Sequence, residues 1–330
     1  MLPIAMVTGA SGYLLYHVMP APFHVAGPFL EGLVGILQPL LIFSMLFLTF
    51  CRIEPKDLKP HRWHWWLLLV QGGLFTLLGF MAIWIMKAFP GAYHDKVVLV
   101  ESAMLCLICP TATAAAVVTR KLGGDVAGIT TYTVLINLLT AVLVPLIVPL
   151  IQPVEGIDFW TAFSMIVARI FPLLIMPCLL AWMVRYMAPR LHQRFLKYPD
   201  LAFYLWAVAL TLAITVTTRS IVHSTMSISF MGMIALISLI CCIFQFALGR
   251  YIGSRYRPRR SLSSCSQVEQ RGKEVRKITA GQALGQKNTV FAIWMAYTFM
   301  TPETAIVGGL YSIWHNFYNS YQLSKRDKEA

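Results

Sequence analysis

Residues 278–291 read ITAGQALGQKNTVF, and they open an otherwise apolar segment that continues to residue 300. Two glycines, two glutamines, a lysine and an asparagine fall within residues 281–288. In a segment that crosses a bilayer, such residues favour a discontinuous helix whose open backbone lines a cavity, because lipid offers the backbone no hydrogen bonds. Lys287 is the most informative residue, since a mid-membrane lysine costs roughly 3 kcal/mol and faces a cavity or a partner. The alternative is a lysine near a helix end whose side chain extends to water.

Composition places this segment in a membrane. The 330-residue chain is 58% hydrophobic and 12% charged, whereas soluble domains carry about 25% charged residues. The net charge of +13 would suggest nucleic acid in a soluble protein, but here the positive-inside rule explains it and no nucleic-acid partner is expected. The sequence predicts an all-α polytopic membrane protein in a lipid bilayer. Its ten apolar segments are residues 4–19, 27–51, 63–88, 96–119, 125–151, 158–187, 198–220, 227–252, 278–300 and 303–323.

The distribution of lysine and arginine predicts the orientation. One set of alternate loops holds 22 of the 27 Lys and Arg residues, and the other set holds three. The first set is therefore expected to be cytoplasmic, together with both termini. We expect an integral protein of the plasma (inner) membrane. The basic set comprises residues 52–62, 120–124, 185–197, 250–277 and 325–329.

The loop at residues 152–157 leaves five predicted spans on each side. An odd number per half inserts the two halves with opposite topology, which is the inverted-repeat architecture of many secondary transporters. The predicted repeats are residues 1–157 and 158–330. Within the second repeat, residues 250–277 have no apolar period and are expected to form a flexible basic cytoplasmic loop.

The fourth predicted span carries a second interruption, equivalent in position to that of the ninth. Residues 105–116 read LCLICPTATAAA. Pro110 has no amide proton and clashes with the carbonyl four residues earlier, and small residues that include Thr111 and Thr113 follow it. Small residues let helices approach closely and let unwound backbone reach a ligand. The alternative is an ordinary proline kink.

Other polar residues inside the predicted spans are weaker signals. Gln71 and Asn137 are typical of interhelical hydrogen bonds. Glu101 lies near the outer end of the fourth span, and a salt bridge or an extension to water explains Arg169 as well as function does. The sequence contains no metal-ligand spacing and no nucleophile–base arrangement. We therefore expect no metal, no cofactor, no catalytic residue and no enzyme activity.

An ordered set of motifs resembles the bile acid:sodium symporter family over nearly the whole chain. The most specific is Ser312-Ile313-Trp314-His315-Asn316, which matches that family's Ser-x-Trp-His-Asn signature in the tenth span. Gly285 to Thr289 stand where the family has Gly-Met-Gln-Asn-Ser in the ninth span. The other similar stretches are residues 46–49, 57–59, 109–114 and 124–127.

The resemblance implies a fold and a class of solute. The family has ten helices in two inverted five-helix repeats, with spans 1, 2, 6 and 7 in a panel domain and the others in a core domain. Spans four and nine are broken and cross each other, and substrate binds at the crossing between the two domains. Family substrates are organic anions such as bile acids, steroid sulfates and smaller carboxylates, normally coupled to two sodium ions.

This chain departs from the family at the positions of the sodium ligands. The alignment implied by the resemblance places Ala283 at the acid of the ninth span and Lys287 at its glutamine. The other replaced sodium-site positions are Ala115, Ala116 and Ile129, whereas Thr133 and Gln71 are retained. A site that has lost its carboxylate and gained an ammonium repels a hard cation, so we expect no sodium coupling.

These inferences predict a secondary transporter of a small organic anion, bile-acid-like or a smaller carboxylate, working by alternating access. Lys287 would replace the ion as a fixed charge, or carry a proton through the cycle. The alternatives are a sodium-coupled symporter of the same family and an exporter or uniporter of another solute. The sequence does not specify the oligomeric state. The candidate substrate- or ion-binding residues are Lys287, Asn288, Gln286, Thr289, Pro110, Thr111, Thr113, Thr133, Gln71, His315 and Asn316.

Overall fold

The computed structural model describes residues 2–19, 27–91, 93–198, 201–256 and 266–329. Within these ranges there is no strand, and a single isolated bridge joins Thr111 to Lys287, so the all-α prediction is confirmed. The elements are α1 (Leu2–Val18), α3 (Gly27–Cys51), the 3-10 helix η1 (Pro55–Asp57), α4 (Arg62–Ala88), α5 (His94–Ile108), α6 (Ala115–Lys121), α7 (Val126–Ile151), α8 (Phe159–Leu174), α9 (Met176–Met187), α10 (Pro189–Leu196), α11 (Leu201–Val222), α12 (Ile228–Arg255), α13 (Ser266–Gly285), α14 (Thr289–Phe299) and α15 (Pro302–Glu329).

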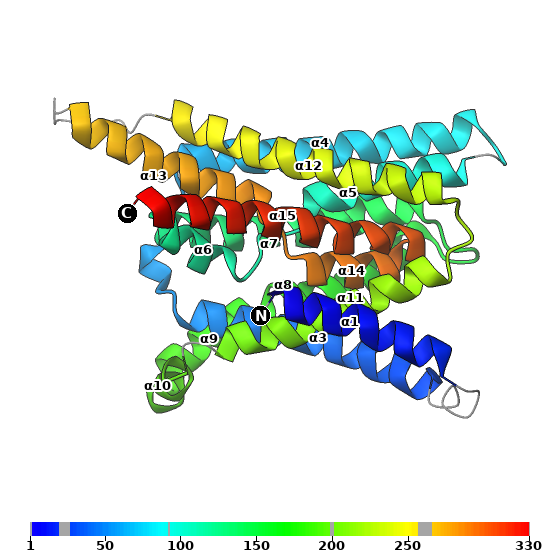
Figure 1. Ribbon diagram of the computed structural model, residues 1–330, viewed down its shortest axis with the longest axis horizontal. Helices are drawn as coiled ribbons and strands as arrows, with labels where there is room; N and C mark the ends of the chain where they lie inside the picture. Colours follow the sequence, from blue (N-terminus) through cyan, green and yellow to red (C-terminus); the bar gives the residue numbers. More distant parts are fainter. Residues whose placement is uncertain (1, 20–26, 92, 199–200, 257–265, 330) are drawn as a thin grey trace.

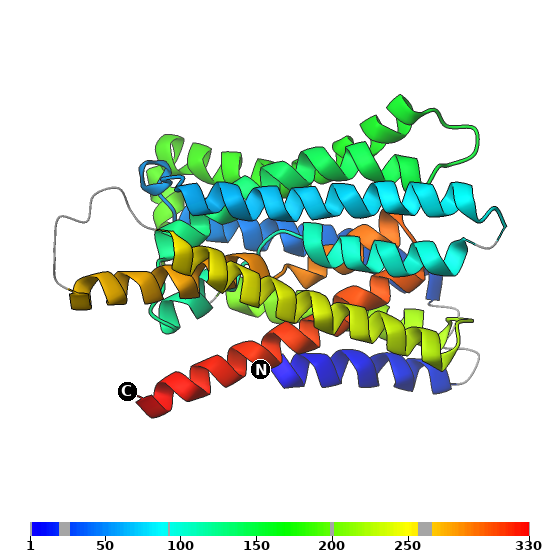
Figure 2. The same ribbon diagram turned by 90° about the horizontal axis from the view of Figure 1, so that it is seen from above.

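The helices pack in two groups. In the first group α11 packs on α1 and on α3, and α3 packs on α9. In the second group α4 packs on α5 and α7, α12 packs on α13 and α15, and α14 packs on α15. Figure 1 shows the first group as the lower layer, and Figure 2 shows that long helices of both groups run in roughly the same direction. Helix α14 of the second group contacts α3 and α11 of the first, so it lies where the groups meet.

Six helical segments are long and apolar enough to cross a membrane: α3, α4, α7, residues 159–187 of α8 and α9, residues 204–222 of α11, and α12. Their outward surfaces carry large apolar side chains, and Trp65, Trp66 and Trp84 of α4 are each more than half exposed. An apolar surface of this extent is typical of contact with lipid. The other predicted spans coincide with α1, with α5 and α6, with α13 and α14, and with α15. The total of ten spans stays a prediction.

Both predicted helix interruptions are present. Helix α5 ends at Ile108 and α6 begins at Ala115, so the chain between them is not helical around Pro110. Helix α13 ends at Gly285, and Asn288 caps the start of α14 by accepting a hydrogen bond from the Phe291 amide at 3.2 Å. Figure 1 shows α5 and α6, and likewise α13 and α14, as separate helices on either side of these breaks.

Residues 250–277 were expected to form a flexible loop, but much of this segment is helical in the structure. Helix α12 continues to Arg255 and α13 begins at Ser266, so only residues 257–265 of this loop lie outside the described chain. The sequence of α13 before Thr279 is rich in Gln, Glu, Lys and Arg and contains no proline, which suits a helix that extends beyond an apolar layer. Reading apolar periodicity alone missed this helix, because its first half is polar on every side.

Candidate functional site

The two helix interruptions cross each other through their backbones. Thr111 and Lys287 form an isolated antiparallel bridge. On one side of it the Ala112 amide donates to the Gln286 carbonyl at 2.9 Å. On the other side the Asn288 amide donates to the carbonyl of Pro110 at 2.8 Å. Backbone groups that the broken helices leave open therefore satisfy each other at the crossing.

The last carbonyls of α5 are also satisfied, and the donors come from four other parts of the fold. A helix that ends inside a protein leaves carbonyls without intrahelical partners, and each needs a donor. Gln245 Nε2 donates to the Cys106 carbonyl at 3.1 Å, and Lys287 Nζ donates to the Leu107 carbonyl at 3.0 Å. Thr140 Oγ1 donates to the Ile108 carbonyl at 3.0 Å, and Gln71 Nε2 donates to the Cys109 carbonyl at 3.1 Å. Two of the predicted site residues, Lys287 and Gln71, thus hold the broken end of α5.

Lys287 is buried, with 2% of its surface exposed, and it makes no ion pair with any described residue. Its ammonium lies at the C-terminal end of α5, where the helix dipole concentrates partial negative charge. The adjoining space, lined by Cys106, Cys109 and Tyr311, measures only about 10 Å³. That space holds about one water molecule, so an organic solute does not fit beside the ammonium in this conformation.

The end of α13 is held in the same manner. Thr111 Oγ1 donates to the Ala283 carbonyl at 2.9 Å, and the Tyr311 hydroxyl donates to the carbonyl of Gly285 at 2.7 Å. Two side-chain atoms at the crossing, Gln286 Oε1 and Asn288 Nδ2, are buried without a hydrogen-bond partner in the described chain. Such atoms are available to a ligand or to a water molecule.

A separate cavity of about 900 Å³ lies where the two helix groups meet. Its lining comes from α1, α3, α8 and α11 on one side and from Trp294, Tyr297 and Thr298 of α14 on the other. Two guanidinium groups reach it, Arg169 and Arg219. Arg219 pairs with Glu31 at 2.6 Å, whereas Arg169 makes no ion pair in the part of the chain that the structure describes. The charged side chains in the lining therefore carry a net positive charge.

Comparison with known protein families identifies the family to which this chain belongs. A family model described as the SBF-like CPA transporter family matches residues 13–323. The chain belongs to the SBF-like CPA transporter family. This family is of the bile acid:sodium symporter type, so the resemblance in the sequence is confirmed. No curated protein sequence matches the chain.

Members of the SBF-like CPA transporter family are transporters and not enzymes. The chain is accordingly an integral membrane transporter of this type. A transporter binds and releases a solute, so the charged crossing and the cavity are the two features that bear on its function. The structure separates them, because none of the predicted site residues lines the cavity.

The four positions that the sequence resemblance aligns with replaced sodium ligands belong to, or pack against, one apolar cluster. Ala115, Ile129 and Ala283 are fully buried members of one apolar cluster with Trp63 and Tyr132, and Ala116 packs against that cluster. Thr133 donates its hydroxyl proton to the Ile129 carbonyl at 2.9 Å. Four positions from three separate segments of the sequence thus contribute to one apolar cluster, and none of the four offers a side-chain oxygen.

The remaining predicted residues contribute less to the crossing. Thr113 lies in the broken stretch and Thr289 begins α14. His315 is buried in α15 beside Tyr311, with its ring 5.7 Å from the tyrosine ring, and its Nδ1 has no partner among the described residues. Asn316 donates back to the Ser312 carbonyl of its own helix at 2.7 Å. In this conformation His315 and Asn316 do not reach the cavity.

Sequence reasoning missed several functional candidates. Arg219, one of the three basic residues in the less basic set of loops, was not among the predicted site residues, yet it lines the cavity at the end of α11. Tyr311 and Gln245 hold the ends of the broken helices, and Gln245 also donates to the Tyr311 hydroxyl at 3.1 Å. A glutamine within an apolar helix was the available signal for Gln245. Glu101 is also fully buried and accepts from Gln152 at 2.7 Å.

Proposed function

We propose that this SBF-like transporter moves a small organic anion by alternating access. In this proposal the chain forms ten transmembrane helices in two inverted repeats, and both termini face the cytoplasm from the plasma (inner) membrane. The first helix group corresponds to a panel domain and the second to a core domain. The proposal is supported by the two packed groups, by the equivalent breaks in α5–α6 and α13–α14, and by the basic loops that gather toward one end of the bundle, at the left in Figure 1.

The cavity of about 900 Å³ is the observation that carries the proposal. Its volume lies within the range of sites that take small organic molecules. Leu30, Val34, Leu212, Val216 and Trp294 give it apolar walls. A planar guanidinium suits a carboxylate, and Arg169 makes no ion pair within the described chain. An amphipathic anion matches this combination of an apolar wall and one available cation.

The test of the solute class uses Trp294 as a reporter, because its indole lines the cavity. The purified protein in detergent is titrated with cholate, a steroid carboxylate, and separately with methyl cholate, which has the same skeleton without the charge. We expect a saturable change in tryptophan fluorescence with cholate and a much weaker one with the ester. Arg169→Gln should lower cholate affinity by about 10- to 100-fold, since a hydrogen bond to a charged group contributes about 1.5–3 kcal/mol.

Arg190→Gln is the matched control, because Arg190 is exposed on α10 and lies outside the cavity. Its cholate affinity should equal that of the wild type. Equal binding of cholate and its methyl ester, or an unchanged affinity in Arg169→Gln, would contradict the proposed recognition of an anion.

We further propose that transport is not coupled to sodium. Four of the positions aligned with sodium ligands, Ala115, Ala116, Ile129 and Ala283, carry apolar side chains and only Thr133 and Gln71 keep a side-chain oxygen, whereas a sodium ion needs several oxygen ligands. The measurement compares thermal unfolding in NaCl and in choline chloride at equal ionic strength. An ion that binds only the folded protein at 100 times its Kd stabilises it by about 2.7 kcal/mol. We expect no such shift, and a clear rise of Tm in NaCl would show that the protein is a sodium symporter.

Lys287 then takes the role of the ion as a fixed positive charge at the crossing. Its hydrogen bond to the Leu107 carbonyl supports this reading, since the ammonium stabilises the open end of a half-helix. The competing hypothesis is a lysine that gains and loses a proton in each cycle. Uptake of cholate into vesicles with an imposed pH gradient separates the two: a fixed charge predicts no response, and uptake that follows the gradient supports the proton carrier.

A further inference from the structure

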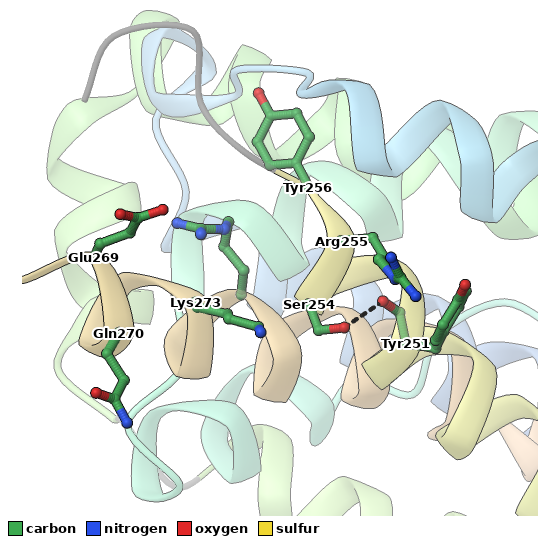
Figure 3. Close-up of a pocket in the computed structure, with 8 residues that line it drawn as sticks. Tyr251, Ser254, Arg255, Tyr256, Glu269, Gln270 and Lys273 are labelled. Atoms are coloured by element: carbon green, nitrogen blue, oxygen red, sulfur yellow. Dashed lines mark hydrogen bonds between the residues drawn. The ribbon is translucent and has the colours of Figure 1, made fainter. Parts of the chain in front are cut away.

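A second large cavity, of about 870 Å³, lies between the C-terminal end of α12 and the first turns of α13. Tyr251, Ser254 and Arg255 line it from α12, and Glu269, Gln270 and Lys273 line it from α13 (Figure 3). It is far along both helices from the crossing, at the end of the bundle that carries the basic loops (Figure 1). Its lining shares no residue with the cavity that we propose for the organic anion.

Three cations line this cavity: Arg255, Lys273 and Arg276. None of them forms an ion pair with a described residue, and Arg276 Nε is buried without a hydrogen-bond partner in the same part of the chain. Other basic residues of this hairpin differ, because Lys277 pairs with Glu274 at 3.2 Å and Arg250 lies 3.7 Å from the same carboxylate. The cavity thus gathers three cations that have no ion pair among the described residues.

The lining also supplies the neutral donors that oxyanions use. Among the lining residues, Tyr251 and Tyr256 carry phenol hydroxyls and Gln270 carries an amide. The Arg255 guanidinium lies 5.2 Å from the Tyr251 ring, a cation–π distance that holds the side chain in place. Glu269 is the single acidic residue in the described lining, so cations outnumber carboxylates three to one.

We propose that this α12–α13 cavity binds a phosphate group, presented either by an anionic phospholipid headgroup or by a soluble organic phosphate. Arginine and lysine are the side chains that bind phosphate most strongly, and the chemistry is the same for both sources. A ligand here would contact α13, which leads directly to Gly285 and Lys287. Gly249 and Gly253 bring α12 against the α13 backbone between the cavity and the crossing.

The experiment uses the full chain in lipid nanodiscs of phosphatidylcholine, with and without phosphatidylglycerol. Binding of phosphatidylglycerol is measured by native mass spectrometry and by the shift of Tm. We compare the wild type with Lys273→Gln/Arg276→Gln and with Arg194→Gln/Lys197→Gln, whose parent residues are exposed at the end of α10. The cavity variant should bind phosphatidylglycerol about 25-fold more weakly, equivalent to about 1 kcal/mol for each cation removed. The α10 variant should bind it as the wild type does.

A parallel arm adds glycerol 3-phosphate to protein in phosphatidylcholine nanodiscs. A Tm shift there that Lys273→Gln/Arg276→Gln abolishes assigns the site to a soluble phosphate, and a shift with phosphatidylglycerol alone assigns it to the headgroup. Equal losses in the cavity and α10 variants would overturn the proposal, because the effect would then be one of total charge. The absence of a wild-type response to both probes would overturn it as well.

Discussion

Substituting Lys287 by methionine should stabilise the folded protein while abolishing transport. Methionine has a similar length and no charge, so it removes the ammonium without leaving a large void. Only 2% of the surface of Lys287 is exposed, and no described carboxylate pairs with its ammonium. Its desolvation therefore lacks the compensation that a buried ion pair provides.

The magnitude follows from two opposing contributions. Burying an ammonium costs several kcal/mol even after the surroundings relax. The hydrogen bond from Nζ to the Leu107 carbonyl at 3.0 Å returns about 1.5–3 kcal/mol, which methionine forfeits. We therefore expect Lys287→Met to raise the free energy of unfolding by about 1–3 kcal/mol, the difference between the desolvation cost and the lost hydrogen bond. A residue kept at such a cost is typical of a functional site.

The assay is thermal unfolding of the purified protein in detergent, followed by intrinsic fluorescence, with transport measured on the same preparations in vesicles. Lys277→Met is the control, since Lys277 lies on the same helix but is partly exposed. It should change stability by less than about 0.5 kcal/mol. A Lys287→Met protein that unfolds several degrees below the wild type would refute the reasoning, because the ammonium would then be a net structural cap for α5.

Three further substitutions test the cavity and the helix contacts. Glu31→Gln removes the acid that lines the described cavity and should raise cholate affinity about fivefold, the equivalent of one exposed ion pair. Gly249→Ala places a methyl group against a carbonyl of α13 and should lower stability by about 1–3 kcal/mol, whereas Gly73→Ala, with open space around it, should not. Tyr311→Phe removes the donor to the last carbonyl of α13 and should lower stability by about 1–3 kcal/mol, and the exposed Tyr321→Phe should not. Titration and thermal unfolding measure these changes.

The positions of the helices and of both breaks were predictable because each has a local cause. Pro110 removes an amide donor, and the polar run that ends in Lys287 and Asn288 has no stable place in lipid. The polar first half of α13 was not predicted, because apolar periodicity does not detect a helix that is polar on every side and extends into water. The assignment of Ala115, Ala116, Ile129 and Ala283 to former sodium positions rests on the resemblance and stays a prediction, although all four belong to or pack against one apolar cluster.

The partners of these residues were not predictable from one sequence. Lys287 donates to Leu107, which lies 180 residues earlier, and the direction of that side chain depends on how the two breaks cross. The cavity likewise assembles Arg169 and Arg219 from two helices that no local pattern connects. Sequence reasoning placed the substrate at the crossing, whereas the structure offers space about 90-fold larger in the cavity than beside Lys287. The packing of segments that are distant in the sequence determines both the partner of Lys287 and the lining of the cavity.

A fixed charge at the crossing has a thermodynamic consequence for transport. Coupling to an ion gradient requires an ion that binds on one side of the membrane and leaves on the other. An ammonium that belongs to the protein never leaves, so it can hold the broken helices together but cannot drive accumulation. We therefore expect vesicles clamped at zero membrane potential and equal pH to equilibrate cholate at the same concentration inside and outside, in NaCl and in choline chloride alike. The measured quantity is the ratio of internal to external cholate at steady state. A ratio well above one in NaCl alone would show sodium coupling despite the apolar cluster around Ala283, and the fixed-charge account of Lys287 would fail.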